Sequence, residues 1–108
     1  MNLMFDSCES LEKLDLSSFN TEKVINFSYM FGKCKYLKSI NLKTFNTKST
    51  VSLEYMFFGC ESLEELDLSS FKIEKKVKTH DMFLKCKKLN FIISNNDFIN
   101  KEYIETKK

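Results

Sequence analysis

Residues 56–71 read MFFGCESLEELDLSSF, and this stretch decides the fold because its pattern recurs at a fixed interval. The Met-Phe pairs keep a 26-residue step, beginning at Met4, Met30, Met56 and Met82. The cysteines keep the same step, at Cys8, Cys34, Cys60 and Cys86. Coincident ladders of this kind are the signature of a tandem repeat. We therefore divide the chain into four copies, residues 4–29, 30–55, 56–81 and 82–108.

Within each copy the spacing of apolar residues changes from two to three or four. Leu66 and Leu68 are two residues apart, the period that places both side chains on one face of a strand. Farther along the chain, an apolar series recurs every three or four residues, at Val24, Phe27, Phe31 and Cys34. That is the spacing of one helical face. We expect Asn20 or Thr21 to cap the start of the helical segment. Each copy is thus predicted to be a short strand, a turn and a short helical return.

A unit of this size buries its apolar face only by stacking against its neighbours. The sequence therefore predicts an α/β repeat, a leucine-rich-repeat-like solenoid of four coils forming one domain over residues 1–108. The fourth copy departs from the pattern, since Ser94 replaces a ladder leucine, and Ile99, Tyr103 and Ile104 follow at helical spacing. We expect a C-terminal cap helix there. No such cap precedes the first copy, so we expect an open first strand edge and a fragment of a longer array.

Charge alternates between the copies, which are negative, positive, negative and positive in turn. Equivalent positions also alternate in sign: Glu9, Lys35, Glu61, Lys87; Glu12, Lys38, Glu64; and Glu22, Lys48, Glu74. Stacking would make these side chains neighbours of opposite charge. The net charge of +2 indicates no partner, and all 17 basic residues are lysine, which counts against nucleic-acid binding.

The residue types that support catalysis or metal binding have a simpler interpretation here. Cysteines one strand spacing apart would spread over roughly 14 Å, so they exclude a single tetrahedral zinc site. Neighbouring cysteines would fall within disulfide range, but buried thiols are favoured. His80 aligns with Ser28 and Glu54, which is typical of a solvated position, and no third group orients it. Gly32 and Gly59 are too few for a phosphate-binding loop. We predict no enzyme activity, no cofactor and no metal.

The outward positions of the strands are the best candidates for binding, because solenoids bind through extended faces. They are Lys13, Asp15, Ser17, Ser39, Asn41, Lys43, Glu65, Asp67, Ser69, Phe91 and Ile93. The alternative interpretation is that these polar residues simply face water. The row Asp15, Asn41 and Asp67 is the predicted centre of the face. Phe91 and Ile93 stand out because exposed apolar pairs tend to be covered, here by the terminal helix or by a partner.

The motif Met-Phe-x-x-Cys-x-x-Leu-x-x-Leu-Asp-Leu-Ser-x-Phe resembles the repeat of BspA-like leucine-rich-repeat surface proteins from low-GC bacteria and some protists. The resemblance extends from Met4 to about Ile93. It implies a repeat solenoid on a cell surface or in a secreted protein, where it binds host or other extracellular proteins. No apolar run reaches membrane-spanning length, and Met1 to Phe5 do not have the pattern of a signal peptide, so the surface location is an expectation from the resemblance alone. A structural spacer, or an array that self-associates through its open N-terminal edge, is the alternative function, and it would also suit an intracellular protein.

Overall fold

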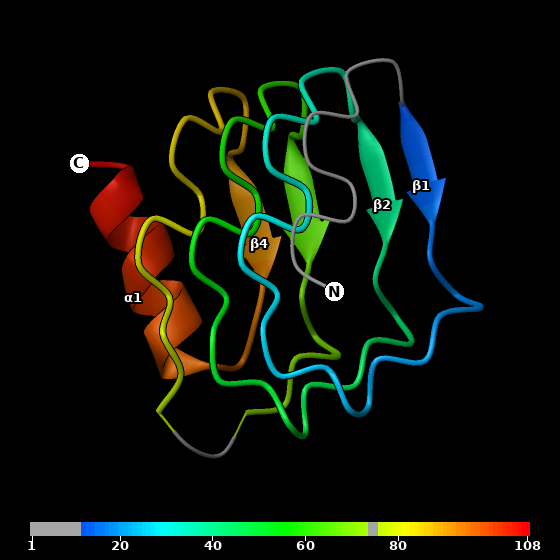
Figure 1. The fold of residues 1–108 in the computed structure, drawn as a ribbon. Coiled ribbons are helices and arrows are strands. Elements are labelled where there is room, and N and C mark those ends of the chain that lie inside the picture. The colour runs from blue at the N-terminus through cyan, green and yellow to red at the C-terminus, as the bar shows by residue number, and fades with distance from the viewer. Residues whose placement is uncertain (1–11, 74–75) are drawn as a thin grey trace.

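The computed structural model describes residues 12–73 and 76–108, in which four short strands precede one helix (Figure 1). The strands are β1 (Lys13–Asp15), β2 (Ser39–Asn41), β3 (Glu65–Asp67) and β4 (Phe91–Ile93), and the helix is α1 (Asp97–Thr106). β1 pairs with β2, and β3 with β4, both in parallel. Leu14 lies opposite Ile40, and Leu66 lies opposite Ile92. Paired residues are therefore the equivalent residues of consecutive copies. The leucine-rich-repeat-like solenoid class stays a prediction.

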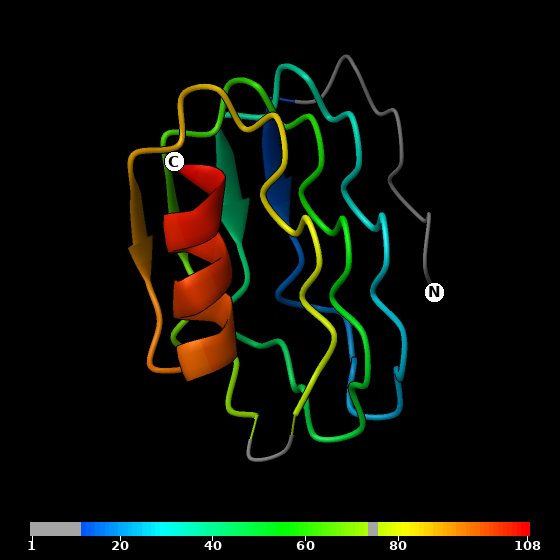
Figure 2. The same ribbon diagram turned by 90° about the vertical axis from the view of Figure 1, so that its left-hand side faces the viewer.

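A second column of inter-copy contacts runs along the side away from the strands. We call it the turn column, residues 26–34, 52–60 and 78–86, and Figure 2 shows its segments side by side. The backbone N–H groups of Phe27 and Phe31 donate to the carbonyls of Ser52 and Met56, each over 3.0 Å. Phe57 donates in the same way to Met82 over 3.0 Å. These bonds tie each copy to the next.

The predicted helical returns are wrong, because α1 is the one α-helix among the described residues. In the turn column Tyr29 and Lys33 have φ values of 59° and 60°. The equivalent residues of the later copies, Tyr55, Gly59, Asp81 and Lys85, are also left-handed. A left-handed residue every four positions breaks a right-handed helix. The apolar spacing of three to four residues arises instead from successive turns, such as the Met30 N–H bond to the Phe27 carbonyl at 3.1 Å.

The expected helix caps serve turns and neighbouring copies instead. The side chain of Asn20 accepts a hydrogen bond from the Glu22 N–H at 3.1 Å, a local turn bond. The Thr21 hydroxyl contacts the backbone of Asn46 in the second copy. Both are therefore used, but neither begins a helix.

The repeat ladders form the core, where equivalent residues stack on one another. The described members with no exposed surface include Met30, Phe31, Leu37, Met56, Phe57, Leu63, Met82 and Phe83. Ring centroids lie 5.6 Å apart between Phe31 and Phe57, and 6.2 Å apart between Phe57 and Phe83. Stacking of this kind adds to the stabilisation that burial of the rings provides.

Helix α1 follows the fourth strand at the place where a terminal helix was predicted (Figure 2). The side chain of its N-cap, Asn96, accepts a hydrogen bond from the Ile99 N–H at 3.0 Å. Ile99 is fully buried, and Tyr103 meets the Phe83 ring edge-on at 5.9 Å. Ile104 faces away from the core instead and is 59% exposed.

Three of the predicted charge pairs form ion pairs, whereas two others among the described residues, Lys35–Glu61 and Lys38–Glu64, do not. Lys38 lies 3.5 Å from Glu12, Lys48 lies 3.9 Å from Glu22, and Lys87 lies 3.6 Å from Glu61. All three pairs are at least one-third exposed, so each contributes little individually. Glu9 and Glu74 lie outside the described residues.

Candidate functional site

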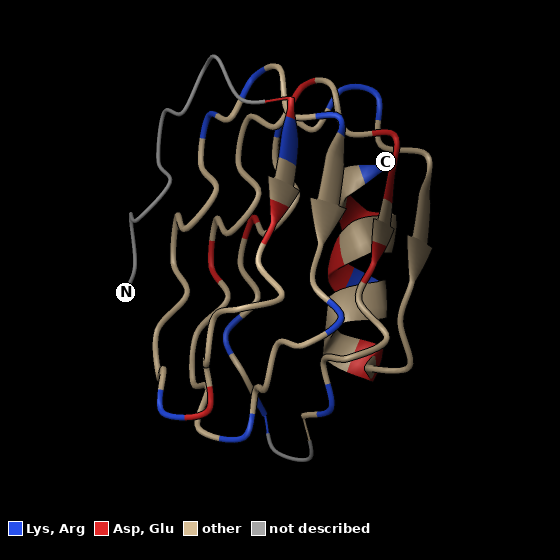
Figure 3. Cartoon of the chain, turned by 90° about the vertical axis from the view of Figure 1, so that its right-hand side faces the viewer, with Lys and Arg blue, Asp and Glu red and all other residues tan. Residues whose placement is uncertain are grey.

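The predicted binding face lies on the outer side of the strands, where nearly all of its side chains are exposed. Asn41 is the exception, being half-buried. β1 carries both signs of charge (Figure 3). Register places Lys13 beside Ser39, and Glu65 beside Phe91. The structure therefore gathers the predicted residues within each strand pair.

The central row of that face also forms turns, which the repeat pattern did not predict. The Oδ1 atoms of Asp15, Asn41 and Asp67 each accept a hydrogen bond from the backbone N–H two residues later, over 2.9, 3.0 and 3.0 Å. The backbone N–H of Ser17 lowers the pKa of Asp15, and hydrogen bonds from the side chain and N–H of Ser69 lower that of Asp67. These side chains end the strands, so their substitution would alter a turn as well as a surface.

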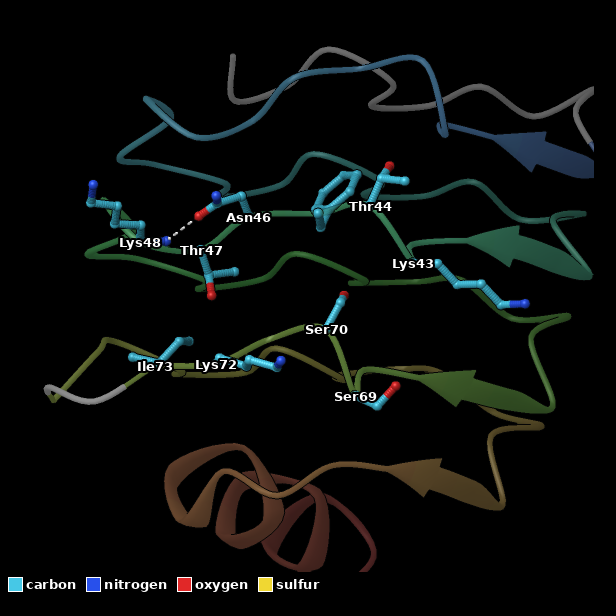
Figure 4. A pocket seen from close by; sticks show the side chains of 10 residues that line it. Lys43, Thr44, Asn46, Thr47, Lys48, Ser69, Ser70, Lys72 and Ile73 are labelled. Carbon is cyan, nitrogen blue, oxygen red and sulfur yellow. Dashed lines mark hydrogen bonds between the residues drawn. The ribbon is translucent and has the colours of Figure 1, made fainter.

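The face is divided between the second and third copies. Among the described residues, no strand ladder joins β2 to β3. Close to these strands, the Ser70 hydroxyl of the third copy donates to the Leu42 carbonyl of the second copy over 2.7 Å. Beyond this contact the chain segments that follow the strands border a groove of about 900 Å³ (Figure 4).

Hydroxyl and ammonium groups line much of this groove. Its lining residues are Lys43, Thr44, Phe45, Asn46, Thr47, Lys48, Ser69, Ser70, Lys72 and Ile73. None of these residues is acidic, although Asp67 is close enough to Lys43 for that lysine to lower its pKa. The Lys48 ammonium is shared with Glu22, whereas Lys72 forms no ion pair within the described residues. The groove is therefore a site of positive charge. Of its lining residues, only Lys43 and Ser69 belong to the binding face predicted from the sequence.

An aromatic cluster on the turn column was also missed. Tyr29 and Tyr55 are half-buried and stack with their centroids 4.7 Å apart, and Phe58 meets both rings edge-on. His80 is exposed, as expected; it packs edge-on against Tyr55 at 5.6 Å and lies 3.0 Å from the Asp81 carboxylate. Tyrosine immediately before the Met-Phe pair in two successive copies was the available signal.

The described cysteines, Cys34, Cys60 and Cys86, are buried free thiols, and the expected burial is confirmed for them. The Cys60 thiol donates to the Phe31 carbonyl, and the Cys86 thiol donates to the Phe57 carbonyl, each over 3.0 Å. Burial raises the pKa of both thiols, that of Cys86 to about 12. They are therefore poor nucleophiles. Cys8 lies outside the described residues.

Two further observations concern the described residues as a whole. They contain no group of three or more His, Cys, Asp or Glu side chains placed to hold a metal ion. Their one helix is also too short and too polar to cross a membrane.

Comparison with known proteins places the chain in a family defined by its sequence. A family model described as "Mycoplasma protein of unknown function, DUF285" matches residues 1–106. Neither the curated proteins nor the solved structures include a match to the chain. Because the family model covers nearly the whole chain, this protein belongs to the DUF285 family.

Proposed function

We propose that this protein is a non-enzymatic protein-protein interaction module built as a BspA-like leucine-rich-repeat solenoid. The 26-residue motif supports this class, and so do the parallel strand pairs that join equivalent residues of consecutive copies. In this proposal the module belongs to a cell-surface or secreted protein. It binds host or extracellular proteins, and not nucleic acid.

The main support for the proposal is the ordered exposure of the outward strand residues. Lys13 and Ser39 are exposed register partners on the first strand pair, and Glu65 and Phe91 are their counterparts on the second. On β4 the polar pattern ends, and Phe91 and Ile93 are 50% and 44% exposed. An apolar pair beside polar neighbours is the composition of a protein-binding surface.

Binding is best tested with side chains that make no bond within the fold. Lys13 and Glu65 are exposed and take part in no ion pair among the described residues. Asp15 and Asp67 are less suitable, because their side chains accept the hydrogen bonds of the turns. The Lys13→Glu and Glu65→Lys variants should therefore fold normally. We expect each to weaken binding to an immobilised panel of extracellular-matrix proteins, measured by surface plasmon resonance.

The matched control is Lys78→Glu, which makes the same charge change on the exposed turn column. Its binding should equal that of the unaltered chain. Equal loss in Lys13→Glu and Lys78→Glu would show a general effect of charge and would refute the strand face as the binding surface. Absence of binding to every protein in the panel would count against the adhesin class.

Self-association is a second candidate function, favoured by the strands at the ends of the stack. Among the described residues β4 pairs with β3 alone, and β1 with β2 alone. Unpaired strand edges are templates for pairing with another chain. Sedimentation velocity over a hundredfold range of concentration tests this function. A sedimentation coefficient that rises with concentration would support an assembling spacer, and a constant monomer value would exclude it.

A further inference from the structure

The groove between the second and third copies contains a buried hydroxyl without a hydrogen-bond partner. Thr47 is only 3% exposed, and its Oγ1 atom makes no hydrogen bond within residues 12–73 and 76–108. Its oxygen points toward the segment that carries Lys72 and Ile73 (Figure 4). A buried hydroxyl left without a hydrogen-bond partner destabilises the fold. An acceptor that entered between these segments would remove that penalty.

The preceding copy shows what normally occupies this position. Thr21, the equivalent of Thr47, accepts a hydrogen bond from the Asn46 N–H at 2.7 Å and donates to the Asn46 carbonyl at 3.2 Å. The residue equivalent to Asn46 in the third copy is Lys72. The bond from Thr47 to that residue is absent, and the groove lies in its place. The opening is thus a local departure from the repeat, located where a hydroxyl and a lysine face the same space.

The charge of the groove defines the ligand that would complete it. Three lysines line it together with threonine and serine hydroxyls, and none of its described lining residues carries a carboxylate. Ser70 already donates to Leu42, and Lys48 is shared with Glu22. Lys72 and Thr47 remain as donors without a partner among the described residues. A small anion with several acceptor oxygens matches this set, because ammonium and hydroxyl donors bind it by charge-assisted hydrogen bonds.

We propose that this groove is a binding site for a tetrahedral oxyanion, the sulfate or phosphate group of a monoester. Lys72 supplies the positive charge, and Thr47 donates its hydroxyl hydrogen. The groove of about 900 Å³ leaves room for the organic part of such an ester. The groove shares Lys43 and Ser69 with the proposed binding face, but the argument for an oxyanion site does not rest on the protein-binding function.

The experiment titrates the full chain, labelled with ¹⁵N, with sodium sulfate and with sodium phosphate at constant ionic strength. We expect saturable shifts of the Thr47 and Lys72 amide resonances at millimolar concentrations, and no saturable shift with sodium chloride. O-phosphoserine and glucosamine 6-sulfate then distinguish the two sources, since the preferred monoester should bind more tightly than its free anion. No saturable shift with any of the four compounds would overturn the proposal.

The variants assign binding to the groove. Thr47→Val removes the hydroxyl while keeping the shape, and should weaken binding about tenfold, the effect of one hydrogen bond to a charged group. Thr50→Val is the matched control, because the Thr50 hydroxyl is also buried and without a partner but does not line the groove. Lys72→Gln should weaken binding, whereas Lys78→Gln should not. Equal affinity in Thr47→Val and Thr50→Val would refute a site at this hydroxyl.

Discussion

The side-chain oxygen of Thr21 lies 2.7 Å from the backbone nitrogen of Asn46, and it joins the first copy to the second in the segments that follow β1 and β2. The turn column joins the same copies by backbone bonds on the opposite side. Between the second and third copies the turn column continues, but the threonine contact does not. The copies are therefore held uniformly on one side and unevenly on the other, and the groove forms where the contact is missing.

The stacked ion pairs predict a small effect of charge reversal that a second reversal restores. Lys38→Glu would place two carboxylates together at the Glu12 position, where the native pair is 3.5 Å apart and exposed. We expect the free energy of unfolding in urea to fall by about 0.2–1 kcal/mol, the range of exposed pairs. The Glu12→Lys/Lys38→Glu double variant should recover that loss, and 1 M salt should remove most of the difference. Failure of the double variant to recover stability would contradict the register.

The strand-ending turn predicts how Asp67 responds to substitution and to acid. Hydrogen bonds from Ser69 lower the pKa of Asp67, so its contribution to stability is present above the pKa of the unfolded chain and is lost as pH falls through the lower folded value. Asp67→Asn keeps the acceptor oxygen, as Asn41 does naturally in the second copy. The free energy of unfolding in urea at pH 7 should therefore change little in the Asp67→Asn variant and should decrease in the Asp67→Ala variant. Equal stability of the two variants would show that the turn bond contributes nothing.

The buried thiols predict slow labelling in the native state. In a Cys8→Ser background, iodoacetamide at pH 8 should modify Cys34, Cys60 and Cys86 only after urea unfolds the chain, as followed by mass spectrometry. A cysteine thiol in the unfolded chain has a pKa of about 9, whereas burial raises the pKa of Cys86 to about 12. The free energy of unfolding should thus be unaffected by these groups below pH 8 and fall as pH rises toward 12. Rapid native labelling at all three positions would contradict the burial of this ladder.

The predictions from sequence held best where a ladder fixes the environment of a residue. Met56, Phe57 and Leu63 are buried because each is stacked between equivalents from neighbouring copies, and the 26-residue step shows this directly. The charge pairs follow from the same step. Register makes Lys38 and Glu12 neighbours, so their pairing could be predicted without knowledge of the backbone between them.

The turn column could not be predicted in the same way, because its conformation depends on backbone handedness. Tyr29 and Lys33 are not glycine, yet both have left-handed backbones. At the position equivalent to Lys33, glycine occurs only in the third copy, as Gly59. The hydrogen bonds to the next copy hold these residues in that conformation, and they are tertiary contacts. The groove depends likewise on a contact missing at Thr47, whose residue type matches that of Thr21. Spacing alone does not distinguish the two threonines.

The stacking of consecutive copies in register is the central claim, and engineered disulfides test it most directly. In the Cys8→Ser background, Lys13→Cys with Ser39→Cys places two thiols on paired strands, whose spacing of about 4.8 Å lies within disulfide range. Lys13→Cys with Glu65→Cys places them two copies apart, at about 10 Å or more. Mild oxidation followed by non-reducing peptide mapping should show rapid bridging in the first variant and none in the second. Equal bridging of both pairs, or bridging of the second pair alone, would contradict the stacked arrangement.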